Sequence, residues 1–409
     1  MKISWRYCFL ILLVYIGIFW SFIQYSLVNV FTYWDELYSL LFGIFIIKAM
    51  SEGGCKGKKE DVGIFFSLLL YCMCSLMGNI ISNYISLSSV LNDLFLNLKF
   101  PMAMYATIFI MRNSEIIDYK HKIIKHLQVI TFMFAGLFVF DKVFNVFPVY
   151  ENRFGINSEQ LIFAHPTFCA AALFYLLMLH VLFGDINKKI EKLCLGILLL
   201  LICMTLRFKA IAVVLLFVAI CVYFLILKAK KLNLGIIGLL GLLVFLVAYK
   251  QIYFYFLSPV ALNMPRGAIL NTSFQIAKDY FPFGTGFGSF GSYVSGSDYS
   301  PVYELYGIHQ IYGMTKDHVD AISDNYWPMI LGQAGIIGFL AMLNMWRLLY
   351  IKIDKYRLKN WVLYLAAIGC FLYIVTSSTS ESAIVNPACM PLAFVFGMVF
   401  SQSEEEYNI

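Results

Sequence analysis

Long, nearly uninterrupted apolar runs follow one another through most of this sequence. Each is about 17–24 residues long, the length that a helix needs to cross a bilayer. Hydrophobic residues make up 61% of the chain and charged residues only 13%, against roughly 45–50% and about 25% in a soluble domain. In lipid, only helices and closed barrels satisfy the backbone, and these runs are too long for barrel strands. We therefore expect an all-α, polytopic membrane protein.

The runs predict about twelve transmembrane helices in a single integral membrane domain that comprises residues 1–409. No internal repeat or low-complexity linker divides the chain. The first run follows Lys2 and Arg6 as in a signal peptide, but no cleavage site of small residues comes after it, so we expect a retained helix. The expected spans are residues 7–24, 33–50, 62–81, 94–111, 126–144, 160–183, 193–206, 210–227, 232–249, 326–346, 361–376 and 387–401.

Lysine and arginine are concentrated in alternate loops, which indicates the orientation of the spans. With the N-terminus inside, the cytoplasmic segments hold most of the 30 lysines and arginines. Both termini are then cytoplasmic. Residues 250–325 are too long and too polar to span, and they form a large external (periplasmic) loop, while residues 145–159 form a smaller one. No basic block is long enough to indicate nucleic-acid binding.

Four basic residues stand at or near the outer ends of the expected spans: Arg153, Arg207, Lys209 and Arg266. Charges at this depth are costly and are usually functional. An arginine side chain presents a rigid fork of donors that matches phosphate oxygens. We therefore expect these residues to bind the pyrophosphate of a lipid-linked substrate. The alternative is that each side chain reaches lipid phosphates or pairs with a nearby acid.

Five tyrosines lie farther out in the large external loop, and each offers a flat apolar face with a polar tip. They could stack on sugar rings and bond to sugar hydroxyls, or they could form a core or an interfacial aromatic belt. These candidate sugar-binding residues are Tyr293, Tyr299, Tyr303, Tyr306 and Tyr312.

The same loop holds the candidate proton acceptors Asp324, His318 and His309. A glycosyl transfer needs a base for the proton of the acceptor hydroxyl. Asp324 is the first candidate, because it lies where the loop re-enters the membrane and partial burial there would raise its pKa. Its alternative role is to cap the helix that begins near Tyr326. The cysteines and histidines show no metal-ligand spacing, and we expect neither a metal nor a cofactor.

A helix is predicted over residues 266–281, and a glycine-rich segment follows it. Gly286, Gly288 and Gly291 match the pattern G-x-G-x-x-G. A dinucleotide-binding fingerprint requires a strand before the glycines and a βαβ unit around them. Here a helix precedes them, so we expect these glycines to let the backbone turn tightly near a ligand or the bilayer instead.

Taken in order, these motifs resemble the O-antigen polymerase and O-antigen ligase superfamily. The topology covers the whole chain, and the motifs are short and lie mainly within residues 150–340. The resemblance rests on Arg153-Phe154-Gly155 before a span, Leu206-Arg207-Phe208-Lys209-Ala210 at an outer turn, Arg266 with its helix and Phe281-Pro282-Phe283-Gly284-Thr285-Gly286-Phe287-Gly288, and Asp324-Asn325-Tyr326-Trp327 followed by Gly332-Gln333-Ala334-Gly335-Ile336-Ile337-Gly338.

The resemblance implies a metal-independent, inverting glycosyltransferase of the bacterial inner membrane. Its substrates would be undecaprenyl-pyrophosphate-linked oligosaccharide repeat units of an O-antigen, capsule or exopolysaccharide. The growing chain would leave its lipid carrier and join a new lipid-linked unit at the outer face, with the matching arginines holding the pyrophosphate. The implied partners are membrane lipid, a chain-length regulator and a flippase, but no nucleic acid. A GT-C-like architecture is compatible with this expectation.

Three alternatives stay open at this point. The first is an O-antigen ligase, which resembles this chain but carries a histidine directly before an asparagine; here Asp324 precedes Asn325, which favours a polymerase. The second is a transporter or flippase of lipid-linked oligosaccharide, a class that tends to show internal repeats and broken helices. The third is a sensor or scaffold for cell-wall synthesis, which would not need converging arginines.

The orientation can be tested with single cysteines. Ser297→Cys and Asn157→Cys should react with an impermeant maleimide added to intact cells, because both positions lie in expected external loops. Lys230→Cys lies in an expected cytoplasmic segment and should not react. Labelling at position 230 but not at position 297 would overturn the orientation.

Overall fold

The computed structural model describes residues 5–26, 29–51, 59–112, 119–153, 155–226, 235, 238–239, 241–242, 249–250, 253–254 and 258–402. These residues are mainly helical, and the strands they contain are one short antiparallel pair. The expectation of an all-α protein is confirmed. Within the described residues, six helices are long and apolar enough to cross a membrane, so the chain is a membrane-embedded protein.

The helices contain most of each expected span, but some extend past it: α4 begins seven residues earlier, at Leu87, and α13 ends eight residues later, at Asp354. The expected span at 232–249 falls almost entirely outside the described residues, and the total of twelve stays a prediction. The helices of this set are α1 (Trp5–Ser26), α2 (Trp34–Ser51), α3 (Lys59–Ser82), α4 (Leu87–Met111), α5 (Lys120–Phe144), α6 (Pro166–Phe183), α7 (Lys189–Met204), α8 (Phe208–Cys221), α13 (Tyr326–Asp354), α14 (Trp361–Ser377) and α15 (Met390–Phe400).

The shorter elements lie between these helices. They are the 3-10 turns at Asn29–Tyr33, Ala261–Asn263, Ile308–Gln310 and Pro387–Cys389, the π-helical turn Val222–Ile226 that extends α8, the strands β1 (Asn152–Arg153) and β2 (Ile156–Asn157), and the helices α10 (Pro265–Asp279), α11 (Tyr293–Ser297) and α12 (Val302–Leu305).

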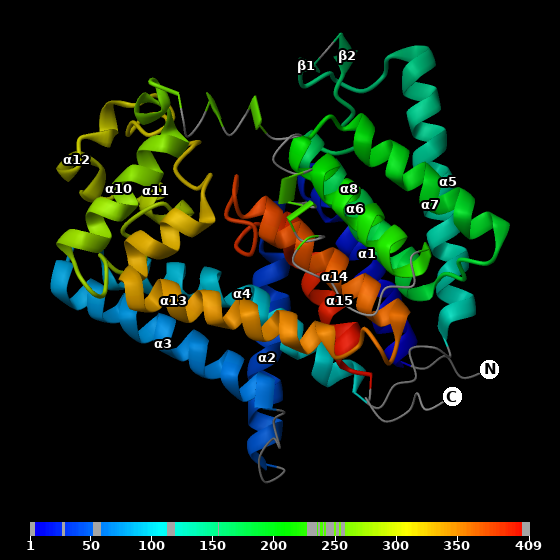
Figure 1. Ribbon diagram of the computed structural model, residues 1–409, viewed down its shortest axis with the longest axis horizontal. Helices are drawn as coiled ribbons and strands as arrows, with labels where there is room; N and C mark the ends of the chain where they lie inside the picture. The colour runs from blue at the N-terminus through cyan, green and yellow to red at the C-terminus, as the bar shows by residue number, and fades with distance from the viewer. Residues whose placement is uncertain are drawn as a thin grey trace.

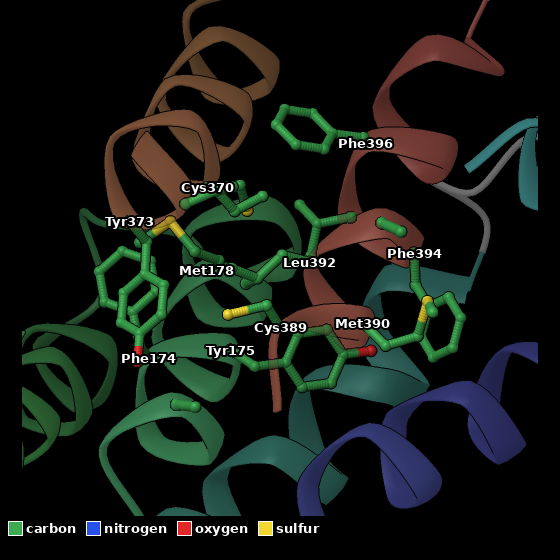
Figure 2. Close-up of a cluster of buried hydrophobic side chains, with 14 of the residues drawn as sticks. Phe174, Tyr175, Met178, Cys370, Tyr373, Cys389, Met390, Leu392, Phe394 and Phe396 are labelled. Carbon is green, nitrogen blue, oxygen red and sulfur yellow. The ribbon is translucent and has the colours of Figure 1, made fainter. Parts of the chain in front are cut away.

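Helix α6 lies at the centre of the main hydrophobic core. It is apolar on all sides, and nearly all of its residues are buried, as expected of a helix enclosed by other helices. Figure 2 shows Phe174, Tyr175 and Met178 of α6 facing Tyr373 of α14 and Met390 at the start of α15. α1, α5, α7, α14 and α15 all pack against α6.

A second set of contacts joins α3 to α13, which run antiparallel along each other (Figure 1). At one end of this pair, Lys355 bonds to Glu60 at 2.7 Å and Lys352 pairs with Asp61. Residues 258–325 lie at the other end. Figure 1 shows α10–α12 above α13 and the β1–β2 hairpin above α8. We call the end of the molecule that carries residues 258–325 and the β1–β2 hairpin the loop end.

A buried charge of α4 is paired with two carboxylates of α2. Lys99 of α4 is buried, and its Nζ lies 2.5 Å from Asp35 and 3.2 Å from Glu36 at the start of α2. An unpaired charge would be costly in an apolar environment. The ion pairs therefore fix α2 against α4.

Residues 258–325 are a folded unit and not an open loop. The predicted helix at 266–281 is confirmed as α10, which ends slightly earlier, at Asp279. The unit has a small hydrophobic core of its own that consists of Ala268, Ile269, Ile276, Phe290, Val302, Tyr303, Ile308, Met314 and Ile322.

The glycine-rich segment 284–291 joins this unit to α3 and α13. The backbone N–H of Thr285 donates to Gly332 at 2.9 Å, and that of Gly286 donates to Gln333 at 2.8 Å. These carbonyls are available because α13 is broken at Gly335, whose φ is +62°. The glycines turn tightly as predicted, with positive φ at Gly286, Gly288 and Gly291. The neighbour that the turns approach is the backbone of α13 and α3, whereas a ligand or the bilayer was expected.

The close approach can be tested with two alanine substitutions at positive φ. Gly307 (φ +69°) has open space where a Cβ would lie, so Gly307→Ala should cost only about 1–2 kcal/mol. Gly286 (φ +91°) has the same backbone strain, and a Cβ there would also overlap the backbone nitrogen of Asn79. Gly286→Ala should therefore lose about 1–3 kcal/mol more, measured as thermal unfolding in detergent. Equal losses would contradict the described contact.

Candidate functional site

The first part of the site is the hairpin segment and the short turn between α7 and α8. The Glu151 carboxylate forms ion pairs with both arginines: it lies 3.0 Å from Arg153 Nε and 3.0 Å from Arg207 Nη1. Arg153 Nη1 also donates to the carbonyl of Leu206 at 3.2 Å. Two of the expected phosphate-binding arginines thus lie on one carboxylate, although they are far apart in the sequence.

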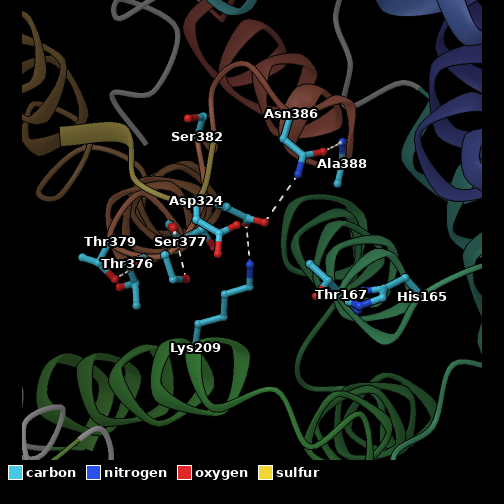
Figure 3. Close-up of polar contacts among 12 residues, drawn as sticks. His165, Thr167, Lys209, Asp324, Thr376, Ser377, Thr379, Ser382, Asn386 and Ala388 are labelled. Carbon is cyan, nitrogen blue, oxygen red and sulfur yellow. Dashed lines mark hydrogen bonds and ion pairs between the residues drawn. The ribbon is translucent and has the colours of Figure 1, made fainter. Parts of the chain in front are cut away.

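The second part joins α8 to the turn between α14 and α15, residues 378–386. Lys209 Nζ lies 2.7 Å from Oε1 of Glu381. Asn386 Nδ2 donates to Oε2 of the same carboxylate at 3.4 Å. Figure 3 shows the Lys209 side chain extending from α8 toward the region between Asp324 and Asn386.

The third part joins α10 to the residues just before α13. Oδ2 of Asp324 accepts from Arg266 Nε at 3.2 Å and from Arg266 Nη2 at 3.0 Å. Arg266 Nη2 also donates to the carbonyl of Ser380 at 3.4 Å. Ser382 donates through its N–H and its hydroxyl to the carbonyl of Ser323, at 3.2 and 3.0 Å. The α14–α15 turn therefore contacts both Lys209 and the Asp324 segment.

These three parts form one group of charges at the loop end, which we call the outer charge cluster. It contains four cations and three carboxylates: Arg153, Arg207, Lys209 and Arg266 with Glu151, Asp324 and Glu381. The parts act on one another, because the charge of Glu381 affects both Arg207 and Asp324. Most of these side chains are largely shielded from solvent, so salt screens their interactions only weakly.

Asp324 does not cap α13. The residue at the N-cap position is Asn325, and the Asp324 carboxylate is used by Arg266 instead. The capping interpretation is therefore wrong, because the nearby guanidinium offers a charged donor. Burial raises the pKa of Asp324 above its usual range, while Arg266 and Lys209 act to lower it. The predicted direction of this pKa change is confirmed.

His165 belongs to the site although sequence reasoning missed it. It stands at the N-cap of α6, where its Nδ1 accepts from the N–H of Thr167 at 3.1 Å. Burial lowers its pKa, and the charges of Arg207 and Lys209 lower it further. A neutral imidazole has one acceptor nitrogen, and Thr167 uses it. The 3.4 Å approach of Arg207 to Nε2 is therefore a packing contact.

The two candidate histidines of the loop lie elsewhere in the 258–325 unit. His318 is exposed, and its ring lies 5.2 Å from that of Tyr312. His309 is partly buried beside the small core. Among the described residues, neither histidine forms a hydrogen bond or ion pair with Asp324.

The five tyrosines do not form one platform. Tyr303 is 0% exposed, and its hydroxyl is used by Gly291 and Ser295, so we withdraw it as a sugar-binding candidate. Two others are mainly structural, since Tyr299 donates to the carbonyl of Met314 and Tyr306 to Asp279. The exposed members of the set are Tyr293 and Tyr312.

Sequence reasoning also missed Glu151, Glu381 and Asn386. A signal for Glu381 was present: it is an isolated acid in a short polar segment between two apolar runs, as Arg207 is an isolated cation. The same argument that selected Arg207 selects Glu381.

The chain matches no known protein family and no curated protein. Within the described part of the chain, no group of three or more His, Cys, Asp and Glu side chains is arranged to hold a metal ion. The feature of this protein that indicates a function is therefore the geometry of the outer charge cluster.

Proposed function

We propose that this protein polymerises undecaprenyl-pyrophosphate-linked oligosaccharide units at the outer face of a bacterial inner membrane. The observation that carries the proposal is the convergence of Arg153, Arg207, Lys209 and Arg266 at the loop end. These cations come from three separate segments, and a diphosphate is an anion that several converging cations fit. The ends of the apolar helices are the depth at which the headgroup of a lipid-linked substrate would lie.

In this proposal, the donor diphosphate replaces carboxylates as the partner of the cations. Arg266 now holds Oδ2 of Asp324 with two donors. Phosphate oxygens are bidentate partners for a guanidinium as well, so a bound diphosphate would release Asp324. The released carboxylate is then free to act as a base. Binding of the donor would thereby prepare the site for reaction.

The reaction is a direct displacement at the anomeric carbon of the donor sugar. Asp324 takes the proton from the acceptor hydroxyl, and the hydroxyl oxygen forms the new bond to the anomeric carbon. The bond from that carbon to the diphosphate oxygen breaks, and its electron pair leaves with the diphosphate. The cations stabilise the charge that develops there. One displacement inverts the anomeric configuration.

The break in α13 does not favour a transporter. Transporters use broken helices whose freed carbonyls coordinate ions. Here the carbonyls of Gly332 and Gln333 accept from the backbone of the glycine-rich segment. The break is thus used for contact within the protein. A ligase would use the same cations, and an assay with both acceptors distinguishes it from a polymerase.

The diphosphate site can be tested at Arg207. Arg207→Ala should leave the protein folded and abolish polymer, because losing a charged partner from a desolvated site costs about 2–5 kcal/mol, or roughly 30-fold or more in rate. Arg207→Lys should rescue poorly, since an ammonium lacks the bidentate fork. The control is Arg347→Ala, at an exposed arginine whose partner is Asn344 of its own helix. Full-length polymer from Arg207→Ala would remove this residue from the site.

The base can be tested with Asp324→Asn. Asparagine is nearly isosteric but cannot take up the proton, and the N-cap of α13 is unaffected because Asn325 occupies it. We expect normal amounts of protein in the membrane but only single repeat units in the surface glycan. Normal chain lengths would exclude Asp324 as the base and move the search to His318 and His309.

A further inference from the structure

Glu381 is the one carboxylate of the outer charge cluster that both contacts a cation and lies on the turn that reaches Asp324. Its two carboxylate oxygens contact Lys209 at 2.7 Å and Asn386 at 3.4 Å. The side chains of Lys209 and Glu381 are only 15% and 13% exposed. A largely buried pair of this kind holds its geometry, because either charge alone would be poorly solvated.

The neighbours of Glu381 in the sequence tie the pair to Asp324. Ser380 accepts from Arg266, the same guanidinium that holds Asp324. Ser382 donates twice to the carbonyl of Ser323, the residue before Asp324. Figure 3 shows Lys209, Asp324 and Ser382 around this point of the α14–α15 turn. Glu381 therefore places Lys209 beside Asp324.

We propose that Glu381 is a positioning residue that holds Lys209 beside Asp324 and offsets the positive charge of Lys209, so that Asp324 stays able to accept a proton. This inference rests on the proposed role of Asp324 as the base. Three charged groups act on Asp324: Arg266 from α10, Lys209 from α8 and Glu381 from the α14–α15 turn. Two cations alone would favour the ionised carboxylate and make it a weaker base.

The signs of the two charges give a test with opposite outcomes. Burial and Glu381 raise the pKa of Asp324, whereas Arg266 and Lys209 lower it. Glu381→Gln leaves Lys209 without its counter-charge, so the acid limb of the pH profile of kcat/KM should move to lower pH by about one pH unit. Lys209→Met should move it to higher pH by a similar amount. The double variant should return near the wild-type profile.

A second readout does not depend on polymerase activity. A hydrophobic carbodiimide modifies protonated carboxyl groups, and mass spectrometry of the Asp324 peptide gives the pH at which half of the protein is modified. This midpoint should move in the same directions in the purified, full-length variants. Lys278→Met is the control, because Lys278 is an exposed lysine twelve residues beyond Arg266 on α10, and it should leave the midpoint unchanged.

The outcomes separate the inference from the proposed function. The midpoints could shift in the two single variants while the wild-type protein makes no polymer. That result would support the electrostatic role of Glu381 and overturn the polymerase. Midpoints that stay unchanged in both single variants would overturn the inference, whatever the activity. A loss of activity at every pH without a shift of the acid limb would show that Glu381 has only a structural role. If Glu381→Gln does not accumulate, Lys209→Met tests the same pair with the opposite sign.

Discussion

Charges in an apolar environment need partners, and this requirement organises the loop end of the molecule. The pairs Arg207–Glu151, Lys209–Glu381 and Arg266–Asp324 each join segments that are distant in the sequence. Because each pair is largely shielded, breaking one leaves a charge that is poorly solvated. The hairpin, the α7–α8 turn, the 258–325 unit and the α14–α15 turn are therefore held together by the same residues that we propose bind an anion. Structure and proposed function depend on one set of contacts.

Much of the fold could be predicted, because a membrane limits the choices. Only helices satisfy the backbone in single apolar runs of this length, so the run at 160–183 had to contain a helix such as α6. The break in α13 at Gly335 could not be predicted, since it depends on hydrogen bonds from the glycine-rich segment about fifty residues earlier. The separate core of the 258–325 unit was missed for the same reason: its residues meet only after the chain has folded.

The candidate site, too, could be predicted from the sequence only in part. Arg207 could be selected because a single cation between two apolar runs is conspicuous in the sequence. Glu381 carries the same signal and could have been selected, but its pairing with Lys209 and that of Glu151 with Arg207 could not, because pairing across distant segments leaves no local pattern. Tyr303 shows the opposite error, since the residue type suggests a sugar platform while its position places it in a small core. Residue type indicates the chemistry that is possible, and burial decides whether a ligand can reach it.

The central claim is that the outer charge cluster recognises a lipid-linked diphosphate. Native mass spectrometry of the purified protein with undecaprenyl pyrophosphate and undecaprenyl monophosphate tests this directly. The account predicts tighter binding of the diphosphate, a preference that is lost when Arg207 and Arg266 are both replaced by methionine, and competition by inorganic pyrophosphate. Equal binding of the two lipids, or a preference for the diphosphate that survives the double replacement, would contradict it.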